Sequence, residues 1–305
     1  MKVQRPTQLL LITLLLVGCM TDADHDGSTA INRVTEDPGA AVIPVERDRI
    51  SSHVNFYGVG KVARYRQNWD SSLVKLESLF FAEIFIAAGG TVSSATIKFP
   101  EPVNEVKELQ YQYSESDAIG DVMYLSGMAQ TDAGLEMKYP SSAYEFTFST
   151  PAGDVLDSVV SFEGGSAPTP PTIVFEQNNQ RIAFDAVNSN LDLFISWPQF
   201  SEGRADPNEI LDDLIFVAID SCIVEDIVHS GRPFEKEDYL TFRAKNYLVP
   251  AGTLEAGQVY SMYVEHALLP NTQQDYGMPA FATFAASTYM DFKTIGETDS
   301  SYCNR

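Results

Sequence analysis

The sequence has few basic residues, few cysteines and no apolar stretch long enough to cross a membrane. Lysine and arginine number 20 against 42 aspartates and glutamates, which gives the 305 residues a net charge of −22. Nucleic-acid binding depends on basic side chains that neutralise phosphates, so this composition argues against nucleic acid as a partner. It also argues against adsorption to anionic lipid headgroups. The apolar run at 9–17 is shorter than the roughly 20 residues that a transmembrane helix needs.

The sequence also lacks the motifs of common catalytic sites. The four histidines form neither an HExxH motif nor a Cys/His cluster with metal-ligand spacing, and no GxSxG turn is present. His229 and Ser230 are adjacent, but a nucleophile and its base must face each other in space, which adjacency does not ensure. We therefore expect a non-catalytic protein without a cofactor. An enzyme whose active site lies in residues 51–165 is the alternative.

Two acidic segments could bind a cation or could simply be solvated. The aspartates of 22–26 have the spacing that opens a calcium-binding EF-hand loop, but Arg33 stands where the bidentate glutamate is required. The second group comprises Glu202, Asp206, Glu209, Asp212 and Asp213. In a chain as acidic as this one, we expect both segments to be solvated, and we predict no metal site.

The N-terminal residues form an export signal. A short basic head precedes the apolar run 9–17, as in secretory signal peptides. The run ends in Leu16-Val17-Gly18-Cys19, which resembles the lipobox of bacterial lipoproteins. This resemblance implies cleavage after Gly18 and acylation of Cys19, and two or three acyl chains give stable anchoring. An ordinary secretory signal that happens to carry a cysteine is the alternative.

The lipobox also bears on where the mature protein resides. Met20 follows the cysteine, whereas an aspartate there tends to retain lipoproteins at the inner membrane. We therefore expect a protein of the cell envelope, held by its acyl chains, and placed in the outer membrane if the organism has two membranes. Residues 19–50 are rich in Asp, Gly, Thr, Ala and Pro, which predicts a flexible acidic tether.

From residue 51 onward, short runs of β-branched and aromatic residues alternate with turn-forming residues. Tyr144, Phe146 and Phe148 alternate with polar neighbours, which is typical of a half-buried strand. Long helical patterns are absent, and only 67–77 could hold one or two helical turns. The strands that we expect before residue 165 are 62–66, 80–86, 93–99, 109–113, 144–150 and 158–162.

A proline- and glycine-rich segment at 164–171 divides the β-rich region in two. Residues 51–165 form a first domain of no recognisable family, and residues 168–296 form a second domain, followed by a tail at 297–305. Each domain is long enough to enclose one sandwich core. We therefore predict an all-β protein with two β-sandwich domains in tandem after the signal peptide (1–18) and the tether.

The second domain carries two groups of apolar residues at fixed spacing. The first is Leu193, Ile195 and Trp197, and the second is Leu254, Tyr260, Met262 and Val264. This pattern resembles a fibronectin type III domain, an immunoglobulin-like sandwich, and the resemblance implies that Tyr260 is the corner tyrosine. The segment exceeds the roughly 100 residues of such domains. An unrelated sandwich with a similar corner is the alternative.

The resemblance also predicts a disulfide. It implies that the strands near 214–219 and 282–294 run parallel in one sheet, so Cys222 and Cys303 follow strand ends at the same pole. Disulfides persist in exported proteins. We therefore expect a Cys222–Cys303 bond, with two free buried thiols as the alternative.

The same topology brings the loops at 198–212 and 267–279 to one pole. Phe200, Tyr276 and Met278 lie on these loops and are candidate ligand-contacting residues, because sandwich proteins often bind through such loops. The alternative is that these loops pack against the first domain. We expect a binding or assembly role with an envelope protein or glycan as partner. A carbohydrate- or protein-binding accessory module for a separate enzyme is a second hypothesis.

Overall fold

A computed structural model describes residues 49–113, 121–221, 227–234 and 239–297, and the structural statements below concern this part of the chain. Its regular elements are almost all strands, which confirms the predicted all-β class. The exceptions are the helix α1 (Asp132–Lys138) and the 3-10 turn η1 (Ile50–Ser52). No helix among the described residues is both long and apolar enough to cross a membrane.

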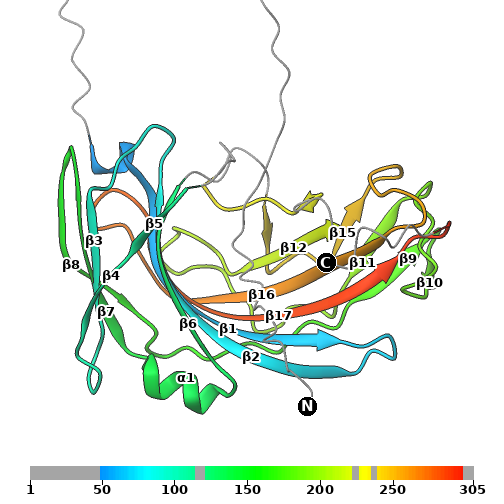
Figure 1. Ribbon diagram of the computed structural model, residues 1–305, viewed down its shortest axis with the longest axis horizontal. Helices are drawn as coiled ribbons and strands as arrows, with labels where there is room; N and C mark the ends of the chain where they lie inside the picture. Colours follow the sequence, from blue (N-terminus) through cyan, green and yellow to red (C-terminus); the bar gives the residue numbers. More distant parts are fainter. Residues whose placement is uncertain (1–48, 114–120, 222–226, 235–238, 298–305) are drawn as a thin grey trace, which may run out of the picture.

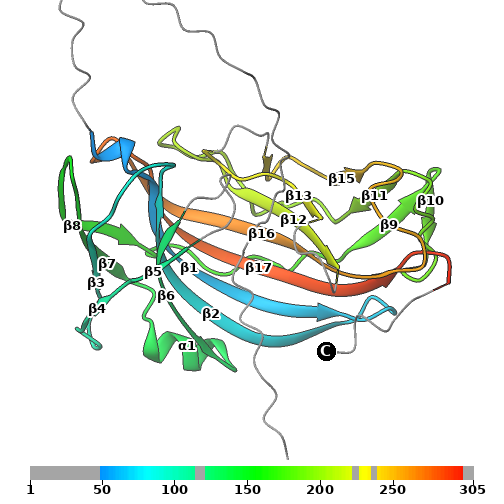
Figure 2. The same ribbon diagram turned by 45° about the horizontal axis from the view of Figure 1, so that its top comes forward.

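The strands form three sheets (Figures 1 and 2). The large sheet has nine strands in the order β13-β12-β16-β17-β1-β2-β6-β5, with β14 also paired to β12. Their bounds are β1 (Val54–Gln67), β2 (Leu73–Ile86), β5 (Gln110–Gln112), β6 (Val122–Ala129), β12 (Leu214–Ser221), β13 (Val228–His229), β14 (Leu240–Thr241), β16 (Val259–Gln273) and β17 (Ala280–Lys293). The first small sheet contains β4 (Val106–Glu108), β3 (Ser94–Lys98), β7 (Ala143–Thr150) and β8 (Gly153–Ser161). The second contains β10 (Gln180–Ile182), β9 (Val174–Gln177), β11 (Leu193–Ser196) and β15 (Asn246–Val249).

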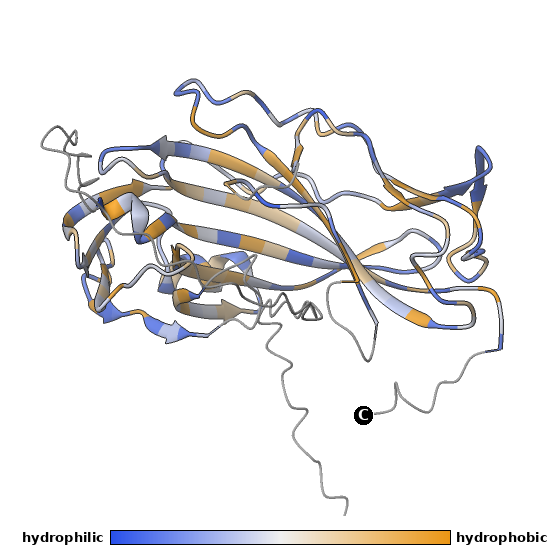
Figure 3. Cartoon of the chain, turned by 90° about the horizontal axis from the view of Figure 1, so that it is seen from above, coloured by the Kyte–Doolittle hydropathy of each residue, from blue (hydrophilic) through white to orange (hydrophobic). Residues whose placement is uncertain are grey.

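Each small sheet closes a hydrophobic core against one part of the large sheet, so the fold is two β-sandwiches. The alternating residues Tyr144, Phe146 and Phe148 of β7 lie fully buried in the first core, as their spacing predicts. Leu193 and Ile195 lie in the second core in the same way. The alternation of apolar and polar residues along the long strands is visible in Figure 3.

The second sandwich has the predicted fibronectin type III-like arrangement. β12 and β17 both pair antiparallel with β16 between them, and β9-β11-β15 form the opposing sheet. The Tyr260 ring is buried, and its hydroxyl accepts a hydrogen bond from the backbone N–H of Glu255 at 2.8 Å. This is the upstream backbone contact that a corner tyrosine makes.

The two sandwiches share the large sheet. β1 of the first sandwich pairs in parallel with β17 of the second, from Tyr57 opposite Ala280 to Arg66 opposite Tyr289. The close approach requires glycine at position 58, where an added Cβ would lie 2.3 Å from the Phe281 carbonyl oxygen. Backbone hydrogen bonds therefore run without interruption from one sandwich into the other.

The hairpin between β16 and β17 also enters the first sandwich. Met278, Ala280, Ala282 and Phe284 belong to the first core. Along the outer edge of β8, the Tyr276 hydroxyl donates to the Leu156 carbonyl at 3.0 Å. A side chain of this hairpin thus forms a hydrogen bond with the backbone of the edge strand β8. Without such contacts, this edge would be open to pairing with another chain.

Local structure differs from the sequence prediction most clearly at one segment. The expected helical turns at 67–77 are wrong, because these residues form the end of β1, a tight turn and the start of β2. In the turn, the Asp70 carboxylate accepts a hydrogen bond from the Ser72 N–H at 2.9 Å. The sequence analysis also missed β6 and the short helix α1, whose N-cap is Thr131.

Candidate functional site

The face of the large sheet that points away from both small sheets carries aromatic and charged side chains, most of them half-buried, and residues 210–211 cover part of it in a third, smaller hydrophobic cluster. We call it the outer face and define it by Phe56, Arg64, Glu77, Phe81, Glu83, Phe85, Tyr124, Tyr263, Glu265, Phe281, Ser287 and Tyr289. These residues alternate along their strands with the residues of the two cores. The outer face therefore spans both sandwiches.

A row of polar side chains crosses the middle of the outer face. The strand register places Glu265 beside Ser287, Ser287 beside Arg64, and Arg64 beside Glu77. Ser287 donates a hydrogen bond to the Glu265 carboxylate, and Arg64 Nη1 lies 2.7 Å from Glu77 Oε1. The Arg64 guanidinium also lies 4.5 Å from the centre of the Tyr289 ring. These contacts fix the row and add a cation–π interaction to the ion pair.

Residues 231–234, which follow β13 and which we call the strap, bring Arg232 and Phe234 against the outer face beside Glu83 and Phe56. The Phe234 ring is 5.6 Å from the Phe56 ring, which also stacks on Phe85 at 4.5 Å. Arg232 in the strap is only 9% exposed, and its Nη1 and Nη2 have no hydrogen-bond partner among the described residues. Its positive charge acts on Glu83. The strap thus places a buried guanidinium with unused donors beside a carboxyl group.

Burial shifts the ionisation of both outer-face carboxyl groups. It raises the pKa of Glu83 to about 8, although the Arg232 charge opposes this shift. It raises the pKa of Glu265 to about 7, opposed by the hydrogen bond from Ser287 and by the Arg64 charge. Near neutral pH both groups therefore carry a proton for part of the time, and a protonated carboxyl donates as well as accepts hydrogen bonds.

The unfolding free energy should fall as the pH rises from 6.5 to 8. A carboxyl that keeps its proton up to about pH 8 in the folded state, but loses it near 4.5 when unfolded, stabilises the fold fully below 4.5 and loses this contribution through 8. His229 and His266 act oppositely, because burial lowers each pKa from 6.5 to about 4, but their effect is complete above 6.5. The expected decrease is about 1–2 kcal/mol after allowance for partial exposure.

Glu83→Gln should flatten this pH dependence and stabilise the protein at pH 8, since the amide mimics the neutral acid. Urea unfolding at several pH values between 6.5 and 8 measures the effect. Glu108→Gln is the matched control, because Glu108 is exposed on β4. An unchanged slope in Glu83→Gln would contradict the assignment of the effect to this carboxyl.

The structure places two of the three candidate loop residues inside the protein and the third, Tyr276, partly buried at the surface. Phe200 is 2% exposed and stacks on His266 at 4.2 Å in the second sandwich. Met278 is 1% exposed in the first core, and Tyr276 packs against that core. Packing against the first domain, which was the alternative for these loops, describes Tyr276 and Met278. Cys19, Cys222 and Cys303 lie outside the described residues.

The acidic loop before β12 uses its carboxylates to fold the loop. Asp206 accepts hydrogen bonds from the backbone N–H groups of Ile210 and Leu211, and Asp213 accepts one from Leu269 N–H at 2.6 Å. Glu202 accepts one from Thr169 N–H at 2.9 Å. Among the described residues, no group of three or more His, Cys, Asp or Glu side chains is arranged to hold a metal ion.

His229 and Ser230 do not form a nucleophile–base pair with each other. The Nδ1 atom of His229 accepts from Gly231 N–H at 3.1 Å, and the Ser230 hydroxyl accepts from Val217 N–H at 2.9 Å. The residues that matter on the outer face were missed by the sequence analysis. Glu83 interrupts the apolar run 79–86, and Glu265 with His266 interrupts the apolar run 262–269; this is the signal that could have found them.

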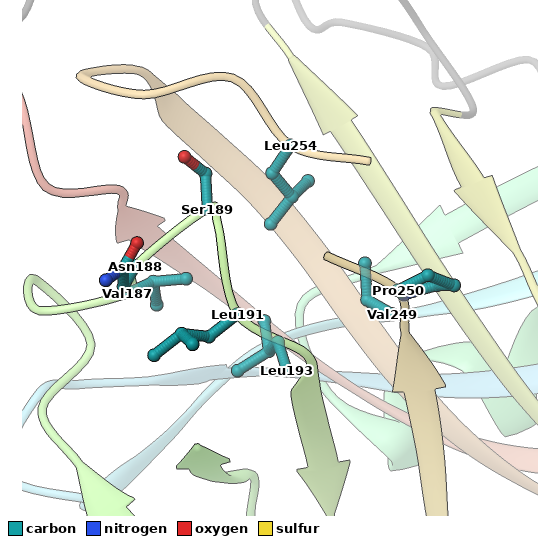
Figure 4. Close-up of a pocket in the computed structure, with 8 residues that line it drawn as sticks. All are labelled: Val187, Asn188, Ser189, Leu191, Leu193, Val249, Pro250 and Leu254. Atoms are coloured by element: carbon teal, nitrogen blue, oxygen red, sulfur yellow. The ribbon is translucent and has the colours of Figure 1, made fainter. Parts of the chain in front are cut away.

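The second core is closed at the end shown in Figure 4. Eight side chains line this space: Val187, Asn188, Ser189, Leu191, Leu193, Val249, Pro250 and Leu254. They leave no room for a molecule the size of water. This end of the sandwich therefore offers no interior ligand site.

Comparison with known proteins gives little beyond the fold. No protein-family model and no curated protein matches the sequence. A crystal structure of the chicken CNTN1 FN1–FN3 domains aligns with 78% of this chain at 14% identity and a TM-score of 0.21. The alignment covers 66% of that chain, just under two thirds. This likeness carries no argument about function, so the strand arrangement itself defines the class: an all-β protein of two sandwiches, the second fibronectin type III-like.

Proposed function

We propose that this protein is a lipid-anchored lipoprotein of the cell envelope that binds a protein partner through the outer face, without catalysis. The lipobox at 16–19 supports the anchor, with acyl chains such as palmitate on Cys19 and, in a bacterium with two membranes, placement in the outer membrane. A disulfide between Cys222 and Cys303 belongs to the same proposal, since an exported chain meets oxidising conditions.

The observation that carries the binding role is the buried guanidinium of Arg232, which has no hydrogen-bond partner among the described residues and lies beside an aromatic surface. A buried donor without a partner costs about 1–3 kcal/mol, so a protein keeps one where a ligand satisfies it. Aromatic and arginine side chains are the residue types that contribute most at protein interfaces. We infer that a partner segment supplies acceptor oxygens to Arg232 and apolar side chains to Phe56 and Phe85.

The nine-stranded sheet suits this role physically. Its central strands β1, β2, β16 and β17 are long and paired on both sides. Side chains on such strands are held by the hydrogen-bonded backbone, so little conformational entropy is lost when a partner binds. The long paired strands therefore favour a rigid binding or assembly surface over one built from adaptable loops.

Site-specific photocrosslinking in the producing cells tests the proposal. A photoreactive residue at Phe234, which is 39% exposed at the rim of the outer face, should crosslink to one dominant envelope protein. Arg232→Ala should reduce that product several-fold, and Cys19→Ala should abolish it by releasing the protein from the membrane. Mass spectrometry identifies the partner and the acyl groups on Cys19.

The same photoreactive residue at Leu156 is the control, because Leu156 is exposed on β8, away from the outer face. Crosslinks that are equally strong from both positions would contradict a specific outer-face interface. A wild-type protein without acyl mass at Cys19 would contradict the anchor and leave the interface result to stand separately.

A further inference from the structure

A hollow lies at the tip of the β1–β2 hairpin, away from the strap. Trp69 in this turn is 53% exposed and borders the hollow. Residues 181–185, around β10 of the second sandwich, form its other walls. Its volume is about 360 Å³, within the range of about 300–1,000 Å³ that small-molecule sites occupy. The hollow therefore has the size of a ligand site and is formed by both sandwiches together.

The indole of Trp69 is fixed in place although it is exposed. Its Nε1–H donates to the Asp291 carbonyl of β17 at 3.0 Å. The turn beneath it is closed by hydrogen bonds between Asn68 and Ser72, both backbone and side chain. Arg181 Nη2 donates to the Ser71 hydroxyl at 3.3 Å, which ties the turn to the second sandwich. Because the ring is already held in place, it loses little conformational entropy when a ligand stacks on it.

The charged groups at the hollow indicate the ligand class. Arg181 and Asp185 oppose each other in charge, so the lining itself is neutral. The chain as a whole carries a charge of −22, which disfavours an anionic ligand. A fixed aromatic face flanked by one strong donor and one strong acceptor suits a molecule with an apolar face and a rim of hydroxyls. A sugar ring has this form.

We propose that the Trp69 hollow binds a neutral oligosaccharide, with one pyranose ring stacked on the indole and its hydroxyls bonded to Arg181 and Asp185. Six residues line the hollow, far fewer than the roughly 20–30 that each partner contributes to a standard protein interface. The site is separate from the outer face and does not depend on the lipid anchor, so either proposal can fail without the other.

The test is titration of the full mature chain with chitohexaose, cellohexaose and maltohexaose, which separates N-acetylated wall-type glycans from plain glucans. The protein has two tryptophans, and Trp197 is only 5% exposed, so acrylamide quenching of fluorescence reports on Trp69. At least one sugar should bind saturably, as measured by calorimetry, and protect Trp69 from the quencher. Absence of binding by all three sugars overturns the proposal.

Variants locate the site. Trp69→Ala should weaken binding about tenfold or more, and Trp69→Phe should restore most of it because an aromatic face remains. Asp185→Asn should weaken binding by a smaller factor with no change in melting temperature. Tyr111→Ala is the control, since Tyr111 is also exposed but lies on β5 at the opposite edge of the first sandwich. Equal affinity of Trp69→Ala and wild type overturns the assignment.

Discussion

Residues 49–165 should not fold when they are produced without residues 168–297. The first half would lose β17 and the β16–β17 hairpin, which supply Met278, Ala280, Ala282 and Phe284 to its core. Burial of a large apolar side chain such as Met278 or Phe284 contributes about 1.5–3 kcal/mol. The parallel hydrogen-bond ladder between β1 and β17 would also be lost. The sum approaches the 5–15 kcal/mol that stabilises a typical domain.

Calorimetry and circular dichroism measure this outcome. The intact chain should unfold in one transition, and residues 49–165 alone should show no cooperative transition. A protease site inserted between Gly165 and Ser166 provides the control, because halves that fold together before cleavage should stay associated afterwards. Two independent transitions in the intact chain, or a cooperatively folded fragment 49–165, would show that the shared sheet is not required for folding.

The sequence alone was sufficient to predict features that depend only on neighbouring residues. Strand identity followed from alternation, as at Tyr144, Phe146 and Phe148, because a half-buried strand imposes a period of two on its own residues. The corner at Tyr260 followed from spacing for the same reason, since its partner Glu255 is only five residues away. Such features are encoded within one element or one turn, so no knowledge of distant pairing is needed to predict them.

What depends on distant pairing was not predicted. Tyr57 and Ala280 face each other across the shared sheet although 223 residues separate them, and no pattern within either strand specifies that register. Long sequence separation also explains why the burial of Phe200 and Met278 was not predicted. Both residues lie on loops as expected, but elements far away in the chain bury them. The 67–77 segment was misjudged because a tight turn between two long strands has no apolar periodicity of its own.

The shared sheet also explains how the candidate sites arise. Arg64 of β1 reaches the row of Glu265 and Ser287 only because β1 lies beside β17. Trp69 bonds to Asp291, and Arg181 reaches Ser71, through the same juxtaposition. Both the outer face and the Trp69 hollow therefore combine residues from the two sandwiches. Damage to the β1–β17 pairing should affect both sites together, whereas damage to one core need not.

Gly58→Ala should destabilise the protein by about 3 kcal/mol or more. The added Cβ would lie 2.3 Å from the Phe281 carbonyl oxygen, and this atom belongs to the backbone, so β1 and β17 must separate locally to accommodate it. Overpacking commonly costs about 1–3 kcal/mol, and here it also weakens the ladder that joins the sandwiches. Urea unfolding measures the loss, and hydrogen exchange should place it in β1 and β17.

Gly134→Ala is the matched control, since it adds the same methyl group in α1, where the nearest atom is the Thr131 hydroxyl oxygen at 3.1 Å. Alanine is favoured over glycine in helices by about 1 kcal/mol, so this variant should be neutral or slightly stabilised. A loss below about 1 kcal/mol in Gly58→Ala would mean that the two strands adjust without strain. The joint between the sandwiches would then be compliant, and the rigidity on which both binding sites rest would have to come from the cores alone.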